Sequence, residues 1–377
     1  MSKQISLSPR IKKSPFYDAT VRHGALGFSV YNKMYLPIGY DDPETEFWSL
    51  VNDVTLWDVA VQRIVEITGP DAFEFTNMLT PRDLTKCKVG NCKYVLITDQ
   101  NGGILNDPVL LRLAENHFWL SRADSDILMW AKGVAVNSGL DVTIGEPDVA
   151  AMQLQGPKSI DVVRKLFEPA ALDLKYYDFM ETTLAGVPVI LARTGWSAER
   201  GYEIYLRGTE NGAEVFDSIL EAGKEFNIKP ISPNRIRRIE GGILDYGVDM
   251  NETTNPFEIG MDRLVSLDTE QDFIGKEALQ SIKEKGVQRK IAGVILDGDP
   301  LNYNEYAWPV LSHDVEIGEL TSCVYSPRIK KNIGYAMLPI ELTAIGTDFT
   351  IQTNQGLRSA TVVEMPFYDP NKSLSRK

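Results

Sequence analysis

The chain has 377 residues, a formal net charge of −13 and an ordinary globular composition, with 43% hydrophobic and 24% charged residues. The acidic balance argues against nucleic acid or an anionic membrane as the main partner. No run approaches the roughly 18 apolar residues of a membrane span, and no apolar core follows the basic N-terminus as a secretory signal requires. We therefore expect a cytoplasmic protein, and we consider a homodimer as its oligomeric state. The charge does not exclude a small anionic ligand, which needs only a local basic pocket.

The first half of the chain predicts alternating helices and strands. A design of strand, Gly-Pro and helix occurs twice, and the repetition hints at a duplicated α+β element. The predicted helices are 45–51, 71–79 and 158–167, and the predicted strands are 64–67, 93–98 and 152–155. The three cysteines are an odd, sparse set, which does not indicate a disulfide framework. Cys87 and Cys92 lack the second cysteine pair or the nearby histidine that a zinc site needs, so no metal is expected.

The segment Asn101–Asp107 is the most informative stretch of the chain. Asn and Gly tolerate positive φ, so Asn101-Gly102-Gly103 predicts a tight turn. A short apolar step then ends at Asp107, which is a good way to direct one acid into a pocket. The alternative is a hairpin turn with an aspartate in water.

The segment from Arg193 to Tyr205 is dense in polar and aromatic groups. Strands are predicted at 187–192 and 203–206, and alternate residues of a strand share one face. Glu203 and Tyr205 should therefore point the same way, and a glutamate can accept hydrogen bonds from an amino-pyrimidine edge. The alternative is an amphipathic strand whose polar face lies in water.

Two further clusters allow a functional and a structural interpretation. Helices are predicted at 212–226 and 233–243, and the second carries Arg237 and Arg238, which could bind a carboxylate or form a surface ion pair with Glu240. The N-terminal aromatics around Lys33 could hold a cation or simply belong to the core.

The C-terminal part changes in texture after Lys276. Short strands at 291–296, 318–325 and 332–337 are separated by Gly, Pro and Asn, which predicts a small all-β module. We place a boundary in the polar stretch 281–289. Neither a dinucleotide-binding Gly-x-Gly-x-x-Gly fingerprint after a strand nor a P-loop is present in the sequence.

Together these segments resemble the tetrahydrofolate-dependent aminomethyltransferases, the family of the glycine-cleavage T-protein. The resemblance covers nearly the whole chain and rests on seven anchors in family order. They are 56–60, Gly69-Pro70-Asp71-Ala72, Tyr94 with Asn101-Gly102-Gly103 and Asp107, 154–157, Arg193-Thr194-Gly195 with 201–204, Arg238-Ile239-Glu240, and 272–276.

The resemblance implies a three-domain, cloverleaf-like α+β fold with tetrahydrofolate in a central hole. The domains it implies are 1–55 with 150–245 for folate binding, 56–149 with 246–280 as a second α+β domain, and 281–377 as a β-rich domain. Glu203 would hold the pterin amino edge, and Tyr94 and Trp196 would line the folate site. Asp107 would be the catalytic carboxylate beside the reacting nitrogen, where it accepts the N5 proton after the transfer. Arg238 would contact folate, with Arg235 or Arg237 as alternatives if the local alignment slips.

Departures from the family suggest a different methyl donor. Asn106 replaces the first of two acids after the Gly-Gly, and Trp196 replaces a family tyrosine. Such changes suit a zwitterion that carries a sulfonium and a carboxylate, held over aromatic rings. The substrate-binding candidates are Tyr31, Lys33, Arg193, Trp196 and Tyr205. The alternatives are an aminomethyltransferase of the glycine-cleavage type and a folate-binding module without catalysis.

Overall fold

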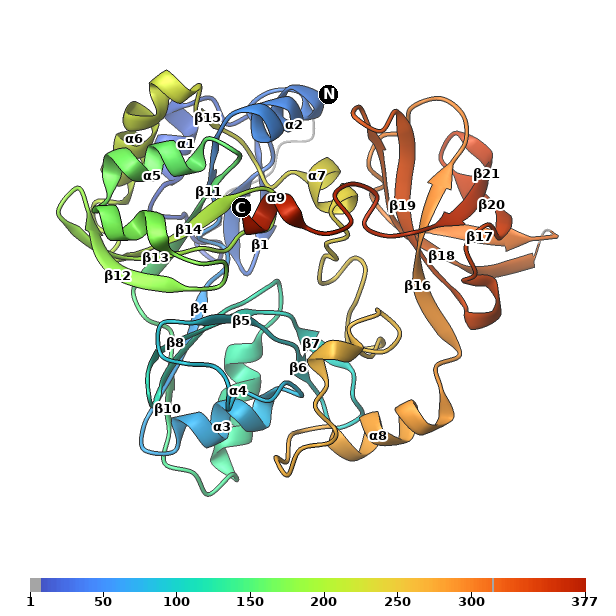
Figure 1. Ribbon diagram of the computed structural model, residues 1–377, viewed down its shortest axis with the longest axis horizontal. Coiled ribbons are helices and arrows are strands. Elements are labelled where there is room, and N and C mark those ends of the chain that lie inside the picture. Colours follow the sequence, from blue (N-terminus) through green and yellow to red (C-terminus); the bar gives the residue numbers. More distant parts are fainter. Residues whose placement is uncertain (1–7, 314) are drawn as a thin grey trace. The chain divides into compact units, whose positions relative to one another are not determined.

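The computed structural model describes residues 8–313 and 315–377, which fall into two compact units (Figure 1). The first unit consists of the described chain up to Val65, Glu146–Gly195 and Glu199–Asn234. The second consists of Glu66–Gly145, Trp196–Ala198 and Arg235–Lys377. Within the described ranges, every helix is too short or too polar to span a lipid bilayer. The three-domain division expected from the sequence stays a prediction.

A six-stranded sheet forms the centre of the first unit. Its strand order is β12 (Phe179–Leu184), β13 (Val187–Ala192), β14 (Gly201–Arg207), β11 (Val149–Gln155), β3 (Thr55–Asp58) and β15 (Lys229–Pro230). Strand β14 lies between β13 and β11, and all of its residues from Gly201 to Leu206 are buried. A charged residue on this strand is therefore placed inside the unit and needs hydrogen-bond partners there.

Short helices and one hairpin complete the first unit. The α-helices are α1 (Tyr17–Arg22), α2 (Pro43–Asn52), α5 (Ser159–Leu166) and α6 (Gly212–Gly223), and the 3-10 helices are η1 (Pro169–Asp173) and η2 (Lys224–Phe226). Helix α6 packs against α1 and α5 with an apolar stripe that includes Val215, Phe216 and Ile219. Strands β1 (Phe28–Tyr31) and β2 (Met34–Pro37) form a separate two-stranded sheet.

The two predicted strand–Gly-Pro–helix elements share one backbone geometry. Gly69 follows β4 (Ile64–Thr68) with φ +124°, and Gly156 follows β11 with φ +122°. A Cβ at either position would lie 2.5 Å from a backbone carbonyl oxygen, that of Asp141 or Asp53 respectively. Only glycine fits both the backbone conformation and the space, so the repeated sequence pattern has one physical cause.

The second unit contains a five-stranded sheet and a small strand pair. The sheet order is β10 (Thr143–Gly145), β4, β9 (His117–Ser121), β8 (Val109–Ala114) and β5 (Cys92–Tyr94). Strands β6 (Ile97–Thr98) and β7 (Ile104–Asn106) pair separately. The helices of this unit are α3 (Ala72–Leu79), α4 (Ile127–Val136), α7 (Arg235–Glu240), η3 (Asp262–Leu264), α8 (Lys276–Lys285), η4 (Ile340–Leu342) and α9 (Ser373–Arg376).

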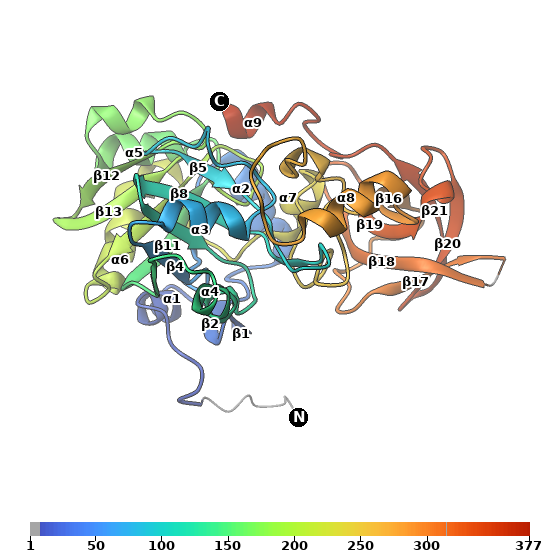
Figure 2. The ribbon, with the colours of Figure 1, turned by 90° about the horizontal axis from the view of Figure 1, so that it is seen from below.

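The end of the chain forms a closed barrel with an apolar interior, whose strands can be followed in Figures 1 and 2. Its strands in order are β16 (Arg289–Leu296), β19 (Lys331–Pro339), β18 (Val315–Ser326), β17 (Trp308–Ser312), β20 (Asp348–Thr353) and β21 (Gly356–Val363). Pairing of β16 with β21 closes the ring, which removes exposed strand edges. Helix α7 packs on β18 and β19.

The α+β class and the all-β C-terminal module predicted from the sequence are confirmed. The strand expected at 93–98 is divided, because Cys92–Tyr94 pairs with β8 whereas Ile97–Thr98 pairs with β7. The helix expected over 233–243 extends only over Arg235–Glu240, since Gly242 has φ +65°. The polar stretch at 281–289 contains the end of α8 and the start of β16.

Candidate active site

The turn before Asp107 has the predicted construction. The Asp99 carboxylate accepts hydrogen bonds from the backbone N–H groups of Asn101 and Gly103, each at 2.8 Å. Gly102 has φ +82°, and a Cβ at Gly103 would lie 2.3 Å from the Glu252 carbonyl oxygen. The turn thus fixes the start of β7, and Asp107 follows directly after that strand.

Asp107 is a half-buried acid whose neighbours include the Tyr94 hydroxyl and the Asp245 carboxylate. Burial raises the pKa of Asp107 to about 8; a hydrogen bond from the Tyr94 hydroxyl to Oδ2, at 2.9 Å, lowers it, and the neighbouring Asp245 carboxylate raises it. Burial also raises the pKa of Asp245 to about 6, and the nearby positive charge of Arg238 limits this rise because it lowers the pKa. Near neutral pH, Asp245 therefore carries the charge and Asp107 keeps its proton.

A cation placed next to Asp107 would change this balance. An opposite charge within a few ångströms favours the ionised form of a carboxyl group and lowers its pKa. Asp107 is thus a proton donor in the protein alone and a proton acceptor when a cationic ligand lies beside it. A group that can change roles near the working pH is suited to acid–base catalysis.

Arg238 lies at the centre of a buried hydrogen-bond network. Its Nη1 donates to Asp249 Oδ2 at 2.5 Å, and its Nη2 donates to Ser322 Oγ at 2.7 Å and to the Tyr303 hydroxyl at 3.1 Å. The guanidinium carbon lies 5.7 Å from the ring centroid of Trp196, and the arginine is 0% exposed. The carboxylate of Asp249 compensates the buried charge, which would otherwise be costly.

Asn106 fastens the segment around Asp107 to a neighbouring loop. Its Nδ2 donates to the Ala123 carbonyl at 3.1 Å and to Ser125 Oγ at 2.7 Å, and its Oδ1 accepts from Ala123 N–H at 2.9 Å. Ser125 also donates to the Leu105 carbonyl. The replacement of a family acid by Asn106 thus has a structural role as well, because the amide joins this segment to the loop at Ala123 and Ser125.

Glu203 forms a second cluster, in the first unit. It is 2% exposed, and its carboxylate accepts hydrogen bonds from Gln153 Nε2 at 2.7 Å, from Thr194 Oγ1 and from the Tyr205 hydroxyl at 3.2 Å. Burial raises the pKa of Glu203, and the three hydrogen bonds lower it. Glu203 and Tyr205 thus share one strand face, as predicted.

The remaining predicted residues have different surroundings. Arg193 is 1% exposed, donates from Nη1 to the Gly201 carbonyl at 2.9 Å and lies over the Tyr202 ring. Tyr31 ends β1, and Lys33 is exposed in the turn before β2. The structure therefore brings six of the candidate residues together in pairs, of which only the third was predicted as a pair: Tyr94 with Asp107, Trp196 with Arg238, and Glu203 with Tyr205.

The sequence analysis missed Asp245 and Tyr246. Tyr246 is hydrogen-bonded to Ser125 and within electrostatic reach of Asp107, and burial raises its pKa to about 12. Both residues follow Gly241-Gly242, which comes directly after helix α7. An acid and an aromatic residue shortly after a glycine turn could have marked them as candidate site residues. Among residues 8–313 and 315–377, no group of three or more His, Cys, Asp or Glu side chains is arranged to hold a metal ion.

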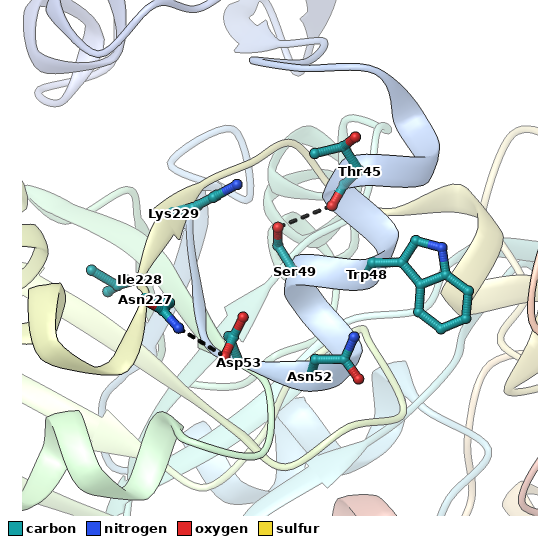
Figure 3. Close-up of a pocket in the computed structure, with 8 residues that line it drawn as sticks. All are labelled: Thr45, Trp48, Ser49, Asn52, Asp53, Asn227, Ile228 and Lys229. Atoms are coloured by element: carbon teal, nitrogen blue, oxygen red, sulfur yellow. Dashed lines mark hydrogen bonds between the residues drawn. The ribbon is translucent and has the colours of Figure 1, made fainter.

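A surface pocket of about 560 Å³ lies in the first unit and contains none of the predicted site residues (Figure 3). Ser49 Oγ donates to the Thr45 carbonyl, and Asn227 Nδ2 lies 3.5 Å from Asp53 Oδ1 (Figure 3). Since these polar groups form hydrogen bonds within the lining of the pocket, we assign the pocket no chemistry. Its lining residues are Thr45, Trp48, Ser49, Asn52, Asp53, Asn227, Ile228 and Lys229.

Comparisons with known proteins agree with this construction. Residues 16–269 match the GCVT N-terminal domain, and residues 289–369 match the glycine cleavage T-protein C-terminal barrel domain. The chain is 36% identical to dimethylsulfoniopropionate demethylase DmdA of Ruegeria pomeroyi, over 95% of this chain and 97% of that protein. It is 29% identical to an aminomethyltransferase of Bacillus cytotoxicus, over 96% of this chain and 99% of that protein.

One solved structure supports the fold. The crystal structure of glycine cleavage system aminomethyltransferase T from Bartonella henselae superposes with a TM-score of 0.85, covering 96% of this chain and 99% of that chain. The sequence identity is 21%, so this likeness concerns the fold alone.

The raised pKa of Asp107 predicts a pH-dependent cost to stability. The folded chain holds this proton up to pH about 8, whereas the unfolded chain releases it near pH about 4, so stability falls as the pH rises between these values. Asp107→Asn removes the effect. Relative to the unmodified protein, its unfolding free energy should rise by at least about 1 kcal/mol between pH 5 and pH 9, measured by urea unfolding. If the unfolding free energies of the variant and the unmodified protein changed with pH in parallel, the raised pKa of Asp107 would be contradicted. The control is Glu221→Gln, a change on an exposed helix face.

The hydrogen bonds of Asn106 predict a loss of stability in Asn106→Asp. A carboxylate cannot donate to the Ala123 carbonyl or to Ser125, and it would place a charge against a carbonyl oxygen. We expect a destabilisation of about 2 kcal/mol in urea unfolding. The same change at exposed Asn354 should have little effect. Equal stability of the two variants would contradict a stabilising role for the hydrogen bonds from Asn106 to Ala123 and Ser125.

Proposed function

The chain belongs to the glycine cleavage T-protein family, and we propose that it is a tetrahydrofolate-dependent dimethylsulfoniopropionate demethylase. In this reaction the S–CH₃ bond of the sulfonium breaks, its electron pair stays on sulfur, and the methyl group moves to N5 of tetrahydrofolate. The products are 3-(methylthio)propanoate and 5-methyltetrahydrofolate. The substrates are small molecules, while a homodimer and a cytoplasmic location remain predictions.

The main support for this proposal is the near full-length similarity to a demethylase, and the unequal carboxyl groups Asp107 and Asp245 suit the chemistry of the transfer. The relative with the higher identity is a demethylase, at 36%, against 29% for the aminomethyltransferase. A sulfonium next to Asp107 would lower the pKa of this carboxyl group from about 8 and leave an ionised base beside the transfer. Asp107 can then accept the N5 proton after the methyl group has moved.

The residues of the chain also fit a reduced pterin. Glu203 is a buried carboxylate fixed by Gln153, Thr194 and Tyr205, and a rigid acceptor of this kind suits a ring edge with two N–H donors. Tetrahydrofolate, when bound, would supply the nucleophilic nitrogen. We propose that Glu203 orients the pterin, that Tyr94 and Trp196 line the site, and that Arg238 acts mainly by positioning Trp196 and Tyr303.

Direct transfer requires alignment of sulfur, methyl and nitrogen, and exclusion of water. Such alignment can supply several kcal/mol of the barrier reduction. Aromatic faces stabilise a cationic donor by roughly 0.5–2 kcal/mol without holding it too tightly in the ground state. We propose that Trp196 serves this role, with Tyr31, Lys33, Arg193 and Tyr205 as the other candidates for substrate contacts.

The folate product distinguishes this function from its alternatives. Purified protein incubated with dimethylsulfoniopropionate and tetrahydrofolate should form 5-methyltetrahydrofolate and 3-(methylthio)propanoate in equal amounts, measured by liquid chromatography with mass spectrometry. Formation of 5,10-methylenetetrahydrofolate from an aminomethylated lipoyl protein would support an aminomethyltransferase instead. Folate binding without turnover of any donor would support a binding module.

Asp107 and Glu203 should affect different kinetic constants. Asp107→Asn removes the proton acceptor, so kcat should fall by about 100-fold or more while the Kd for tetrahydrofolate stays nearly unchanged. Glu203→Gln replaces one acceptor oxygen by a donor, so the Kd for tetrahydrofolate should rise by about tenfold. Exposed Glu181→Gln serves as the control. Full turnover in Asp107→Asn, or unchanged folate affinity in Glu203→Gln, would refute the respective role.

A further inference from the structure

Helix α7 carries three arginines, and one of them differs from the other two. Arg237 and Arg238 are both 0% exposed; Arg237 donates to the Ala198 carbonyl at 3.0 Å, and Arg238 is paired with Asp249. Arg235 is exposed, and its guanidinium carbon lies 4.1 Å from the ring centroid of Tyr303. Arg235 therefore presents a cation to solvent while one face of it is held against an aromatic ring.

The ring under Arg235 is held in place by the protein interior. The Tyr303 hydroxyl accepts a hydrogen bond from Arg238 Nη2 at 3.1 Å. The next residue, Asn304, donates from Nδ2 to the Thr321 carbonyl at 2.9 Å and accepts from Cys323 N–H at 2.7 Å. Because the Tyr303 hydroxyl and the adjacent Asn304 are both held by hydrogen bonds, the ring under Arg235 has a fixed position. Part of the entropy cost of ordering Arg235 for a ligand is therefore already met before binding.

Arg235 is linked electrostatically to Asp107 through Asp245. Arg235 lies within electrostatic reach of Asp245, and Asp245 lies within reach of Asp107. Exposed Arg235 within electrostatic reach of half-buried Asp245 complements a small molecule that carries both a cation and a carboxylate. The guanidinium of Arg235 can bind a carboxylate through two parallel N–H···O bonds at its edge while its face stays on Tyr303.

We infer that Arg235 binds the carboxylate of the methyl donor and that Tyr303 is its positioning residue. This inference rests on the proposed function, because it takes the donor to be a sulfonium carboxylate. Other cations of the chain suit the role less well. Arg238 already donates to four protein acceptors, and Arg193 is 1% exposed. Lys33 lies in a turn and offers a single ammonium rather than a planar fork.

Calorimetric titration with two ligands tests the inference. Dimethylsulfoniopropionate carries the carboxylate, and its methyl ester keeps the sulfonium but loses the negative charge. Arg235→Gln should weaken binding of the acid by about tenfold or more and leave binding of the ester unchanged. Arg164→Gln removes an exposed arginine of α5 and should bind both ligands like the unmodified protein.

The role of Tyr303 is separated from a purely structural role by a conservative variant. Tyr303→Leu removes the ring and should weaken binding of the acid several-fold, with little change for the ester. Tyr303→Phe keeps the ring and should restore most of the affinity. Equal loss for the acid and the ester in Tyr303→Leu would contradict a specific positioning role.

The possible outcomes separate this inference from the proposed function. Unmodified protein that binds neither compound and forms no 5-methyltetrahydrofolate contradicts both. Unmodified protein that binds both compounds, with an Arg235→Gln variant that binds the acid as well as before, contradicts the inference alone. Folate also carries a glutamate carboxylate, so tetrahydrofolate is titrated in parallel. A loss confined to tetrahydrofolate, and larger for its oligoglutamyl form, would assign Arg235 to folate and overturn its assignment to the donor.

Discussion

The chemistry available in the second unit depends on the burial of one carboxyl group beside another. Asp107 and Asp245 cannot both be ionised at low cost in a poorly hydrated site. Asp245 is opposed by Arg238 and ionises first, and Asp107 keeps its proton to a pKa of about 8. A cationic donor next to Asp107 would lower its pKa and favour its ionised form. The arrival of the substrate itself would thereby produce the base that the reaction needs.

The position of this acid pair depends on interactions that take no part in the reaction. The buried Arg238–Asp249 ion pair links α7 to Ser322 on β18, and thus fixes the side of the site that carries Tyr303. On the other side, Asn106 holds the segment before Asp107 to the loop at Ala123. These contacts are internal to the second unit. A buried ion pair stabilises little by itself, and we attribute to it the fixing of geometry rather than a gain in stability.

Features that follow from local rules could be predicted from the sequence. The turn before Asp107 needs glycine for its backbone conformation, and alternation along a strand places Glu203 and Tyr205 on one face. Features that depend on packing between distant segments could not. Nothing in the sequence of α7 shows that Arg235 is exposed while Arg238 is buried, because the barrel decides this. Asp245 approaches Asp107 only through the fold, and the residue type of Asn106 does not reveal that its amide bonds to the loop at Ala123.

The titration of Asp107 tests the central claim most directly. Carbon-13 NMR of protein labelled at the aspartate carboxyl groups, with Asp107→Asn used to assign the signal, gives the pKa with and without dimethylsulfoniopropionate. We expect a midpoint of about 8 in the protein alone and a clearly lower one with the sulfonium bound. A midpoint of about 4, the ordinary value for aspartate, under both conditions would contradict the claim that this acid holds its proton until a cation arrives.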